Sequence, residues 1–162
     1  NPAADIRGAL TALVGLDAGA KIRTGGITAE EHPSATVVAE FIVACQIAQV
    51  PFKATAGLHH PITHFATSVN ATQLGFINVF LGACLLHAGR IKSGQLVDVL
   101  SEEDAAAFNF GNDAAGWKGH SATLDEIETA RWRFAHSFGS CSFAEPLDEL
   151  RKLGLIEKET TA

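Results

Sequence analysis

The chain has 162 residues, of which 47% are hydrophobic and 19% charged, and its formal net charge is −6. A chain of this length and composition can form one domain with a substantial core, and it is not typical of disordered or fibrous proteins. The acidic balance argues against a broad attraction to nucleic acid or to anionic membranes, so we expect neither as a partner. The longest apolar run, residues 74–88, is shorter than the ~20 residues that span a bilayer, and it contains Asn78.

The cysteines and the start of the chain bear on its compartment. Cys45, Cys84 and Cys141 are widely spaced and form no Cys-x-x-Cys pair, which fits a reducing compartment. No basic segment followed by an apolar one precedes the first helical pattern. We therefore expect a cytoplasmic protein. The chain contains no methionine and begins at Asn1, so a fragment of a longer protein is one interpretation.

The first two thirds of the chain alternate helix patterns with short strand patterns. Apolar residues at helical spacing predict helices over residues 3–14, 34–49 and 72–87. Residues 20–24 and 51–56 have the pattern of short strands, and each run is followed by glycine. Strands and helices that alternate at this spacing predict parallel strands joined by right-handed crossover connections.

The last third is more charged. Capping-box patterns that begin at Ser101 and Thr123 predict helices that start near Glu102 and Leu124. Residues 101–122 are also rich in Gly and Asn towards their end, and we interpret them as an insertion-like loop region.

The end of the chain completes the expected domain. Residues 138–143 are a candidate third strand, and residues 145–153 a final helix that stops at a glycine. The prediction is a single α/β domain over residues 1–156, with parallel strands, crossover helices and a more helical C-terminal third. Residues 157–162 are expected to form a flexible tail.

One lysine lies in a long stretch without other charges. Between residues 41 and 89, counting histidine as neutral, Lys53 is the only charged residue, although the chain's own composition of 19% charged residues would place about nine there. A lysine in a buried parallel strand needs a reason to accept desolvation. We therefore expect Lys53 to be buried and to serve as a reactive amine or proton-transfer group. The alternative is a lysine whose ammonium reaches solvent at the strand end or pairs with a distant carboxylate.

Alternation along the two strands groups further residues with Lys53. With a period of two, one strand face carries Lys53, Thr55 and Gly57, and the corresponding face of the earlier strand carries Lys21, Arg23 and Gly25. Three cations on one face attract an anion, and ligands of α/β sheets bind outside the carboxyl ends of the strands. Glycine at both strand ends allows the backbone to approach a ligand closely. The alternative is that Lys21 and Arg23 form ion pairs with the nearby carboxylates of Asp17, Glu30 or Glu31.

The loop after the second strand contains three of the seven histidines, His59, His60 and His64. Such crowding suggests either metal ligation or proton transfer and hydrogen bonding to a substrate. The chain has no Asp or Glu between Glu40 and Asp98, and the spacing matches no closed zinc site, so metal would need partners from elsewhere. We therefore name no metal ligand and expect no cofactor, and we take His60 or His59 as the proton-transfer group.

Hydroxyl groups near the candidate third strand form the last part of the predicted site. Ser140 and Ser142 stand next to a predicted helix N-terminus, where backbone N–H groups favour anions. The alternative is that Ser142, three residues before Glu145, is only a helix cap. Cys141 lies between the two serines but lacks basic neighbours other than His136, which makes it a weak candidate nucleophile.

Two short motifs carry a resemblance to a known family. The run Lys-Ile-Arg-Thr-Gly-Gly (21–26), followed by Phe-Lys-Ala-Thr-Ala-Gly (52–57), is similar to consecutive strands of a (β/α)8 barrel. The Lys-x-Thr-x-Gly pattern at 53–57 resembles the Schiff-base strand of class I aldolases such as deoxyribose-phosphate aldolase. The longer run Phe-Lys-Ala-Thr-Ala-Gly-Leu-His-His-Pro (52–61) resembles bacterial proteins of unknown activity. Because a complete barrel takes roughly 250 residues, the resemblance implies the C-terminal part of a (β/α)8-like barrel.

These observations favour an enzyme, or part of one, that acts on a small anionic carbonyl compound, phosphorylated or carboxylated, with lyase chemistry of the aldolase type. In this interpretation Lys53 is the imine-forming or electrostatic amine and Lys21, Arg23 and Thr55 contact the anion. The alternatives are a non-catalytic anion-binding or assembly domain and a histidine-bound metal hydrolase. A part-barrel leaves apolar faces open, so we expect a homodimer that buries the helix at 72–87, or a missing N-terminal region of the same protein.

Overall fold

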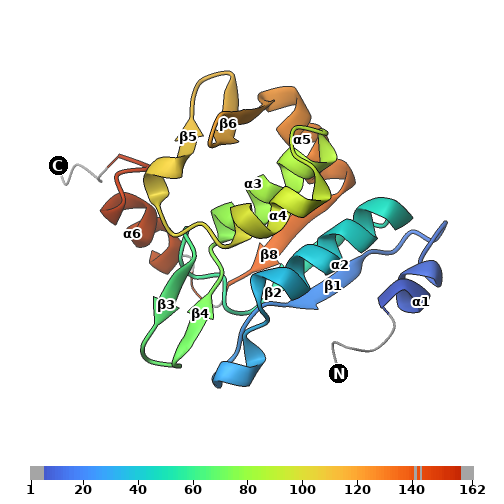
Figure 1. Cartoon of the computed structure of the whole chain (residues 1–162), viewed down its shortest axis with the longest axis horizontal. Coiled ribbons are helices and arrows are strands. Elements are labelled where there is room, and N and C mark those ends of the chain that lie inside the picture. Colours follow the sequence, from blue (N-terminus) through green and yellow to red (C-terminus); the bar gives the residue numbers. More distant parts are fainter. Residues whose placement is uncertain (1–5, 141, 143, 158–162) are drawn as a thin grey trace.

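The structure is a computed structural model that describes residues 6–140, 142 and 144–157. Its central element is a parallel three-stranded sheet in the order β1 (Ala20–Arg23), β2 (Phe52–Thr55) and β8 (Ala135–Gly139), shown in Figure 1. The parallel pairing of the first two strands confirms the prediction from the alternating elements. The chain therefore has a mixed α/β fold, but the strands that the structure describes do not close into a barrel.

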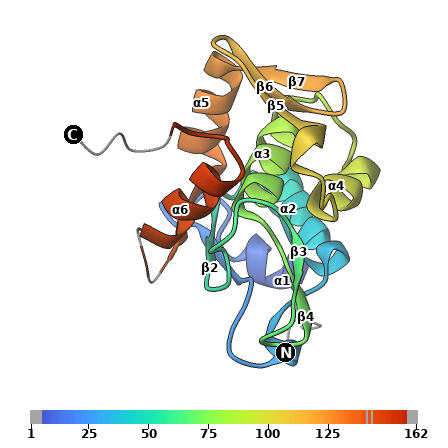
Figure 2. The same ribbon diagram turned by 90° about the vertical axis from the view of Figure 1, so that its left-hand side faces the viewer.

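Helices cover one face of this sheet. The helices α2 (Ala35–Ala48), α3 (Phe76–His87) and α5 (Leu124–Arg133) contact β1 or β8, and α4 (Ser93–Leu100) packs against α2 and α3. Figures 1 and 2 show these helices gathered together on one side of the sheet. The short helix α1 (Ile6–Thr11) packs against α2. Residues of the sheet that point towards the helices form the centre of the core; Phe52 and Ala54 are 1% and 0% exposed.

Local signals explain where several elements begin and end. The hydroxyl of Ser34 accepts a hydrogen bond from the N–H of Val37 at 3.3 Å and caps α2, as the sequence predicts. The α2 helix ends where Gln49 takes a left-handed conformation, with φ of 54°. The capping box of Thr123 and Glu126 is also present, and α5 begins directly after it.

The helix predicted to form the dimer surface, α3, is largely buried within this chain. Eight of the twelve residues of α3 are buried within this chain, where α3 lies between α4, α5 and the strands β7 and β8. The apolar circumference that suggested self-association is thus that of a central helix. The α3 helix begins at Phe76 rather than near residue 72, because residues before it form a hairpin of β3 (His64–Ala66) and β4 (Ala71–Gln73).

The region 101–122 is not a loop insertion. It contains two strands and most of a third, in an antiparallel sheet of β5 (Phe108–Phe110), β6 (Ala114–Trp117) and β7 (His120–Thr123). Gly111, Asn112 and Gly119 lie in the connections between these strands, and in the second connection Lys118 and Gly119 have φ of 44° and 83°. The turn residues were therefore visible in the sequence, but the short segments between them were not recognised as strands.

The helix predicted near Glu102 does not form. Instead, the Glu102 carboxylate lies 2.6 Å from the Lys118 ammonium and accepts a hydrogen bond from the indole N–H of Trp117 at 3.1 Å. This contact ties the segment before β5 to the turn after β6. Asp104, the other member of that apparent capping box, caps only a short 3₁₀ helix over Ala105–Ala107. The helix α4, which the sequence analysis did not predict, lies just before this region.

The last strand begins earlier than predicted. Strand β8 starts at Ala135, three residues before the expected start, because Ala135 already pairs with Phe52 of β2. The final helix α6 (Ala144–Lys152) agrees with the prediction. Most of the predicted flexible tail, residues 158–162, lies outside the described residues. None of the helices that the structure describes has the length and apolar character needed to cross a membrane.

Candidate anion-binding face

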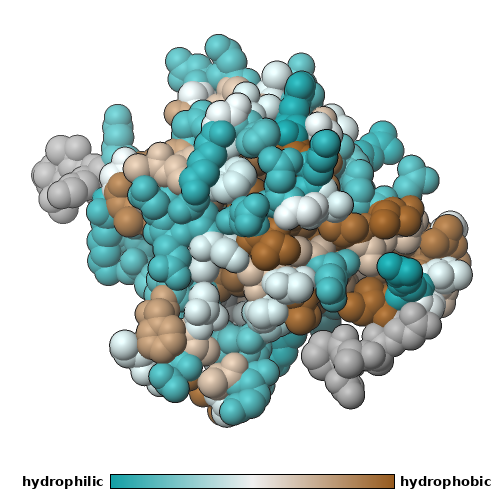
Figure 3. Space-filling model, viewed as in Figure 1, coloured by the Kyte–Doolittle hydropathy of each residue, from teal (hydrophilic) through white to brown (hydrophobic). Residues whose placement is uncertain are grey.

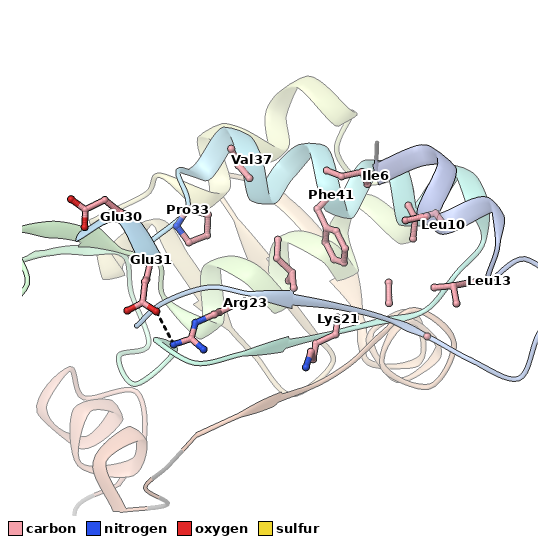
Figure 4. A pocket seen from close by; sticks show the side chains of 14 residues that line it. Ile6, Leu10, Leu13, Lys21, Arg23, Glu30, Glu31, Pro33, Val37 and Phe41 are labelled. Carbon is pink, nitrogen blue, oxygen red and sulfur yellow. Dashed lines mark ion pairs between the residues drawn. The ribbon is translucent and has the colours of Figure 1, made fainter. Parts of the chain in front are cut away.

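The strand side chains that point away from the helices form a polar surface, which we call the cationic face. It carries Lys21 and Arg23 from β1 and Lys53 and Thr55 from β2, as strand alternation predicts. Lys21 and Lys53 are direct register neighbours, and so are Arg23 and Thr55. Figure 4 shows Lys21 and Arg23 on the side of β1 opposite α2. The sequence thus predicted correctly which of these residues share a face.

The expected burial of Lys53 is wrong, because Lys53 is exposed. The prediction assumed a parallel strand covered on both faces, but α2, α3 and α5 cover only the face that carries Phe52 and Ala54. The charge-free stretch around Lys53 reflects burial of the surrounding helices and of the other strand face. The Lys53 ammonium in this structure is therefore solvated rather than held in an apolar cavity.

The three cations differ in their partners. The Arg23 guanidinium lies 3.2 Å from the Glu31 carboxylate, and its Nε donates to the carbonyl oxygen of Gly25 at 2.8 Å. Glu31 therefore neutralises Arg23, which is the alternative that the sequence left open. Within the described part of the chain, neither Lys21 nor Lys53 has a carboxylate partner within ion-pair distance. The uncompensated charge of the cationic face is that of these two lysines.

The glycines at the strand ends approach each other. A Cβ on Gly25 would lie 2.6 Å from the Cα of Gly57, and a Cβ on Gly57 would lie 2.7 Å from the Cα of Gly25. Gly57 also has a φ of 74°. Their conformational role is thus to let the two loops after β1 and β2 touch, whereas the sequence alone suggested close approach to a ligand.

Threonine hydroxyls join the carboxyl ends of the same strands. The buried Thr24 hydroxyl donates to the carbonyl oxygen of Ala56 at 2.6 Å. The Thr55 hydroxyl donates to the carbonyl oxygen of Ile22 at 3.3 Å. In this structure Thr55 donates its proton to the neighbouring strand, so it can contact an anion only by giving up that hydrogen bond.

The histidine loop contacts helix α6. Nδ1 of His59 lies 2.8 Å from Oε2 of Glu145, and Nδ1 of His60 lies 3.2 Å from Oε2 of Glu149. The rings of His60 and His64 meet edge to face, with centroids 4.1 Å apart. Figure 2 shows α6 beside β2 and the segment that follows it. Two histidine–carboxylate pairs therefore stand near the carboxyl end of β2.

The environment of His60 favours its neutral form. Partial burial, and secondly the neighbouring His64, lower the pKa of His60 below its usual 6.5, although Glu149 opposes this shift. The pKa of Glu149 is lowered from its usual 4.5, chiefly by a hydrogen bond from Lys152 and secondarily by His60. With Nδ1 directed at Glu149, Nε2 of a neutral His60 is available as a proton acceptor near neutral pH.

The depressed pKa of His60 predicts a loss of stability on mild acidification. The unfolded chain binds this proton more readily than the folded chain, so the free energy of unfolding falls as the pH drops from 6.5 towards the lower folded pKa. Burial also lowers the pKa of His87 and adds a loss of the same sign. We expect urea unfolding of His60→Gln between pH 8 and 5 to depend less on pH than that of the unmodified chain.

The difference between the two unfolding curves isolates His60, because His87 contributes equally to both. Below pH 4.5 protonation of Glu149 removes further stability, so measurements stop at pH 5. Parallel curves for the two proteins would contradict the proposed environment of His60.

Glu145 and Glu149 were missed by the sequence interpretation. They are four residues apart on α6 and therefore share one side of that helix, while His59 and His60 are adjacent on the loop. The spacing of the two glutamates could have been recognised in the sequence. Nothing in the chain order, however, indicates that residues 86 positions apart, His59 and Glu145, would meet.

The serines after β8 are held in a local turn. The Ser142 hydroxyl accepts a hydrogen bond from the N–H of Glu145 at 3.2 Å, and so caps α6. The Ser140 hydroxyl donates to the carbonyl oxygen of Ser142 at 2.7 Å. Capping, the alternative to anion binding, is thus present for Ser142. The candidate nucleophile Cys141 lies outside the described residues.

Across residues 6–140, 142 and 144–157, no group of three or more His, Cys, Asp or Glu side chains is placed to hold a metal ion. Protein-family models, curated proteins and solved structures include no match to this chain.

Proposed function

We propose that the chain binds a small anionic carbonyl compound, phosphorylated or carboxylated, on the cationic face, and that Lys53 supplies the key amine of a lyase reaction of the aldolase type. The observation that supports this proposal most is the pairing of Lys21 with Lys53 in adjacent strands, on a face that the helices leave open. Neighbouring strands lie about 4.8 Å apart, so two ammonium groups there repel each other. A bound anion removes that repulsion.

The chemical roles follow from the positions of the groups. The neutral Nζ of Lys53 attacks the carbonyl carbon, a C–N bond forms, and loss of water gives an imine. His60, whose depressed pKa keeps it neutral near pH 7, exchanges the protons. His59 is the second candidate for this role. Lys21 holds the anionic group, Arg23 joins it by exchanging its ion pair with Glu31 for the anion, and Ser140 and Ser142 after β8 are further contacts.

The proposal extends to the surrounding fold and its location. Parallel strands with helices packed on one face have the arrangement of a (β/α)8 barrel wall, so we propose that this sheet is part of such a barrel. The histidine loop then lies at the catalytic end, after a strand. Cys45 and Cys84 are buried and unpaired, which supports a cytoplasmic location.

A non-catalytic anion-binding domain is the second candidate, and the exposure of Lys53 favours it. Desolvation is a common means of making a lysine nucleophilic, and this environment does not supply it. The cationic face would then bind an anion by charge alone. The two candidates share the binding step and differ only in the covalent step.

The experiment measures both steps with the same variants. Calorimetry with inorganic phosphate and with pyruvate reports binding, and borohydride treatment with pyruvate followed by mass spectrometry reports imine formation at Lys53. Lys53→Ala is expected to weaken anion binding about tenfold, since a hydrogen bond to a charged group contributes roughly 1.5–3 kcal/mol and 1.4 kcal/mol is about tenfold. Lys53→Arg should retain most of the binding but lose the trapped adduct.

Lys92→Ala, which removes an exposed lysine just before α4, is the matched control and should behave like the unmodified chain. Anion binding without an adduct at Lys53 would select the non-catalytic candidate. Equal affinities of the unmodified chain and Lys53→Ala would refute the site.

A further inference from the structure

Strand β1 is an edge strand whose outer side is open. It pairs with β2 alone among the strands that the structure describes. The N–H groups of Ala20 and Thr24 donate to Pro51 and Thr55, on the β2 side, at 2.8 and 2.9 Å. Because alternate residues of a strand direct their backbone groups to opposite sides, the N–H and C=O groups of Lys21 and Arg23 point to the open side. An edge of this kind is a template for another strand.

An apolar groove runs beside this edge. It has a volume of about 610 Å³ and lies between β1, α1 and α2. Figure 4 shows Leu10 and Leu13 from the N-terminal segment and Val37 and Phe41 from α2 facing the groove. Figure 3 shows hydrophobic surface gathered on the side of the molecule where α1 and α2 lie. A segment lying along β1 can therefore bury apolar side chains on its helix-facing side.

The opposite side of the same edge is cationic at Lys21, because Glu31 neutralises Arg23. Lys21 and Arg23 also line the groove, but their side chains lie on the side of β1 opposite α2, and Lys21 has no carboxylate partner within the described part of the chain. Side chains of an added strand alternate between the two sides. Directly opposed charges of unlike sign stabilise a strand pair and like charges destabilise it. An added strand therefore fits best if apolar residues alternate with acidic ones.

We propose that the free edge of β1 docks an extended segment of a partner polypeptide in which apolar and acidic residues alternate, so that it adds a fourth strand to the sheet. The segment bonds to the backbone of Lys21 and Arg23, fills the groove with its apolar residues, and places its carboxylates beside Lys21. This site goes beyond the proposed anion site, because it depends on the strand edge and the groove and does not require Lys53.

A second copy of the chain fits this edge less well. Pairing of β1 with another β1 would bring Lys21 and Arg23 against like charges. Pairing with β8, the other edge strand, would offer His136 and Ser137 but no carboxylate. Charge complementarity therefore favours a partner with a different sequence.

The test uses a fluorescein-labelled eight-residue peptide of alternating valine and glutamate and measures binding by fluorescence anisotropy. We expect saturable binding of this peptide. A peptide of alternating valine and lysine should bind at least tenfold more weakly. A peptide that has the same four valines and four glutamates, but in two separate blocks, should lose a similar amount of affinity. N-methylation of alternate residues blocks the hydrogen bonds of one peptide edge only. One of the two N-methylated sets should therefore lose at least tenfold in affinity, while the other binds like the parent.

Protein variants test the same contact from the other side. Lys21→Pro removes the outward N–H and the charge, whereas Lys21→Ala removes the charge alone, so the proline variant should bind at least tenfold more weakly than the alanine variant. The N-methylated peptides, measured on the unmodified chain, keep the test valid if the proline variant unfolds. Lys53→Ala should bind the peptide normally, which separates this site from the anion site.

Three results would overturn the proposal. Equal binding of both N-methylated sets would exclude strand pairing, and equal binding of the glutamate and lysine peptides would exclude charge complementarity. A dimer in light scattering that Lys21→Pro dissociates would assign the edge to a second copy.

Discussion

Replacing Phe52 with alanine is expected to lower the free energy of unfolding by about 3–5 kcal/mol. Phe52 is 1% exposed, and its ring lies 5.2 to 6.1 Å from the ring centroids of Phe134, Phe41 and Phe80. The substitution therefore leaves a cavity where the sheet meets the helices, and it removes three aromatic contacts. Urea unfolding followed by tryptophan fluorescence measures the change.

Phe65 supplies the matched control for this substitution. It is 54% exposed on the β3 hairpin strand, so Phe65→Ala should change the free energy of unfolding by less than about 0.5 kcal/mol. If Phe52→Ala does not fold, Phe52→Leu is the milder variant and should still lose more stability than Phe65→Ala. Similar losses at the two positions would mean that the sheet does not pack on the helices as described.

Replacing Asn78 with leucine is expected to cost roughly 2–5 kcal/mol of stability, because a buried polar group left without a partner costs about 1–3 kcal/mol. Asn78 is fully buried and accepts a hydrogen bond from the N–H of Thr63 at 3.0 Å. Its amide nitrogen donates to the carbonyl oxygens of Val99 and Glu102, both at 2.8 Å. Leucine, which has a similar volume, removes all three bonds while keeping the helix apolar.

Asn112→Leu is the control, since Asn112 is exposed in the turn between β5 and β6. Urea unfolding should separate the two variants by at least about 2 kcal/mol. Equal stability of Asn78→Leu and the unmodified chain would show that the asparagine does not join α3 to the segments around Thr63 and Val99.

The local and periodic features of this protein follow from its amino-acid sequence alone. Alternation placed Lys21, Arg23, Lys53 and Thr55 on one face, because side chains of a strand point to opposite sides whatever packs against them. The order of strands and helices predicted parallel pairing, since short connections cannot join parallel neighbours. Helix starts at Ser34 and Thr123 followed from hydrogen bonds within one turn.

What covers each surface and which distant residues meet depend on the packing of the whole chain. The exposure of Lys53 depends on helices packing against one sheet face and not the other, and the sequence of the strand is compatible with both arrangements. The pairing of His60 with Glu149 likewise depends on where α6 lies. Asn78 had stood out only as a polar residue in an apolar run, and its role depends on the carbonyl groups that α4 brings to it. Such long-range contacts depend on packing interactions across the whole chain, so a short sequence pattern does not predict them.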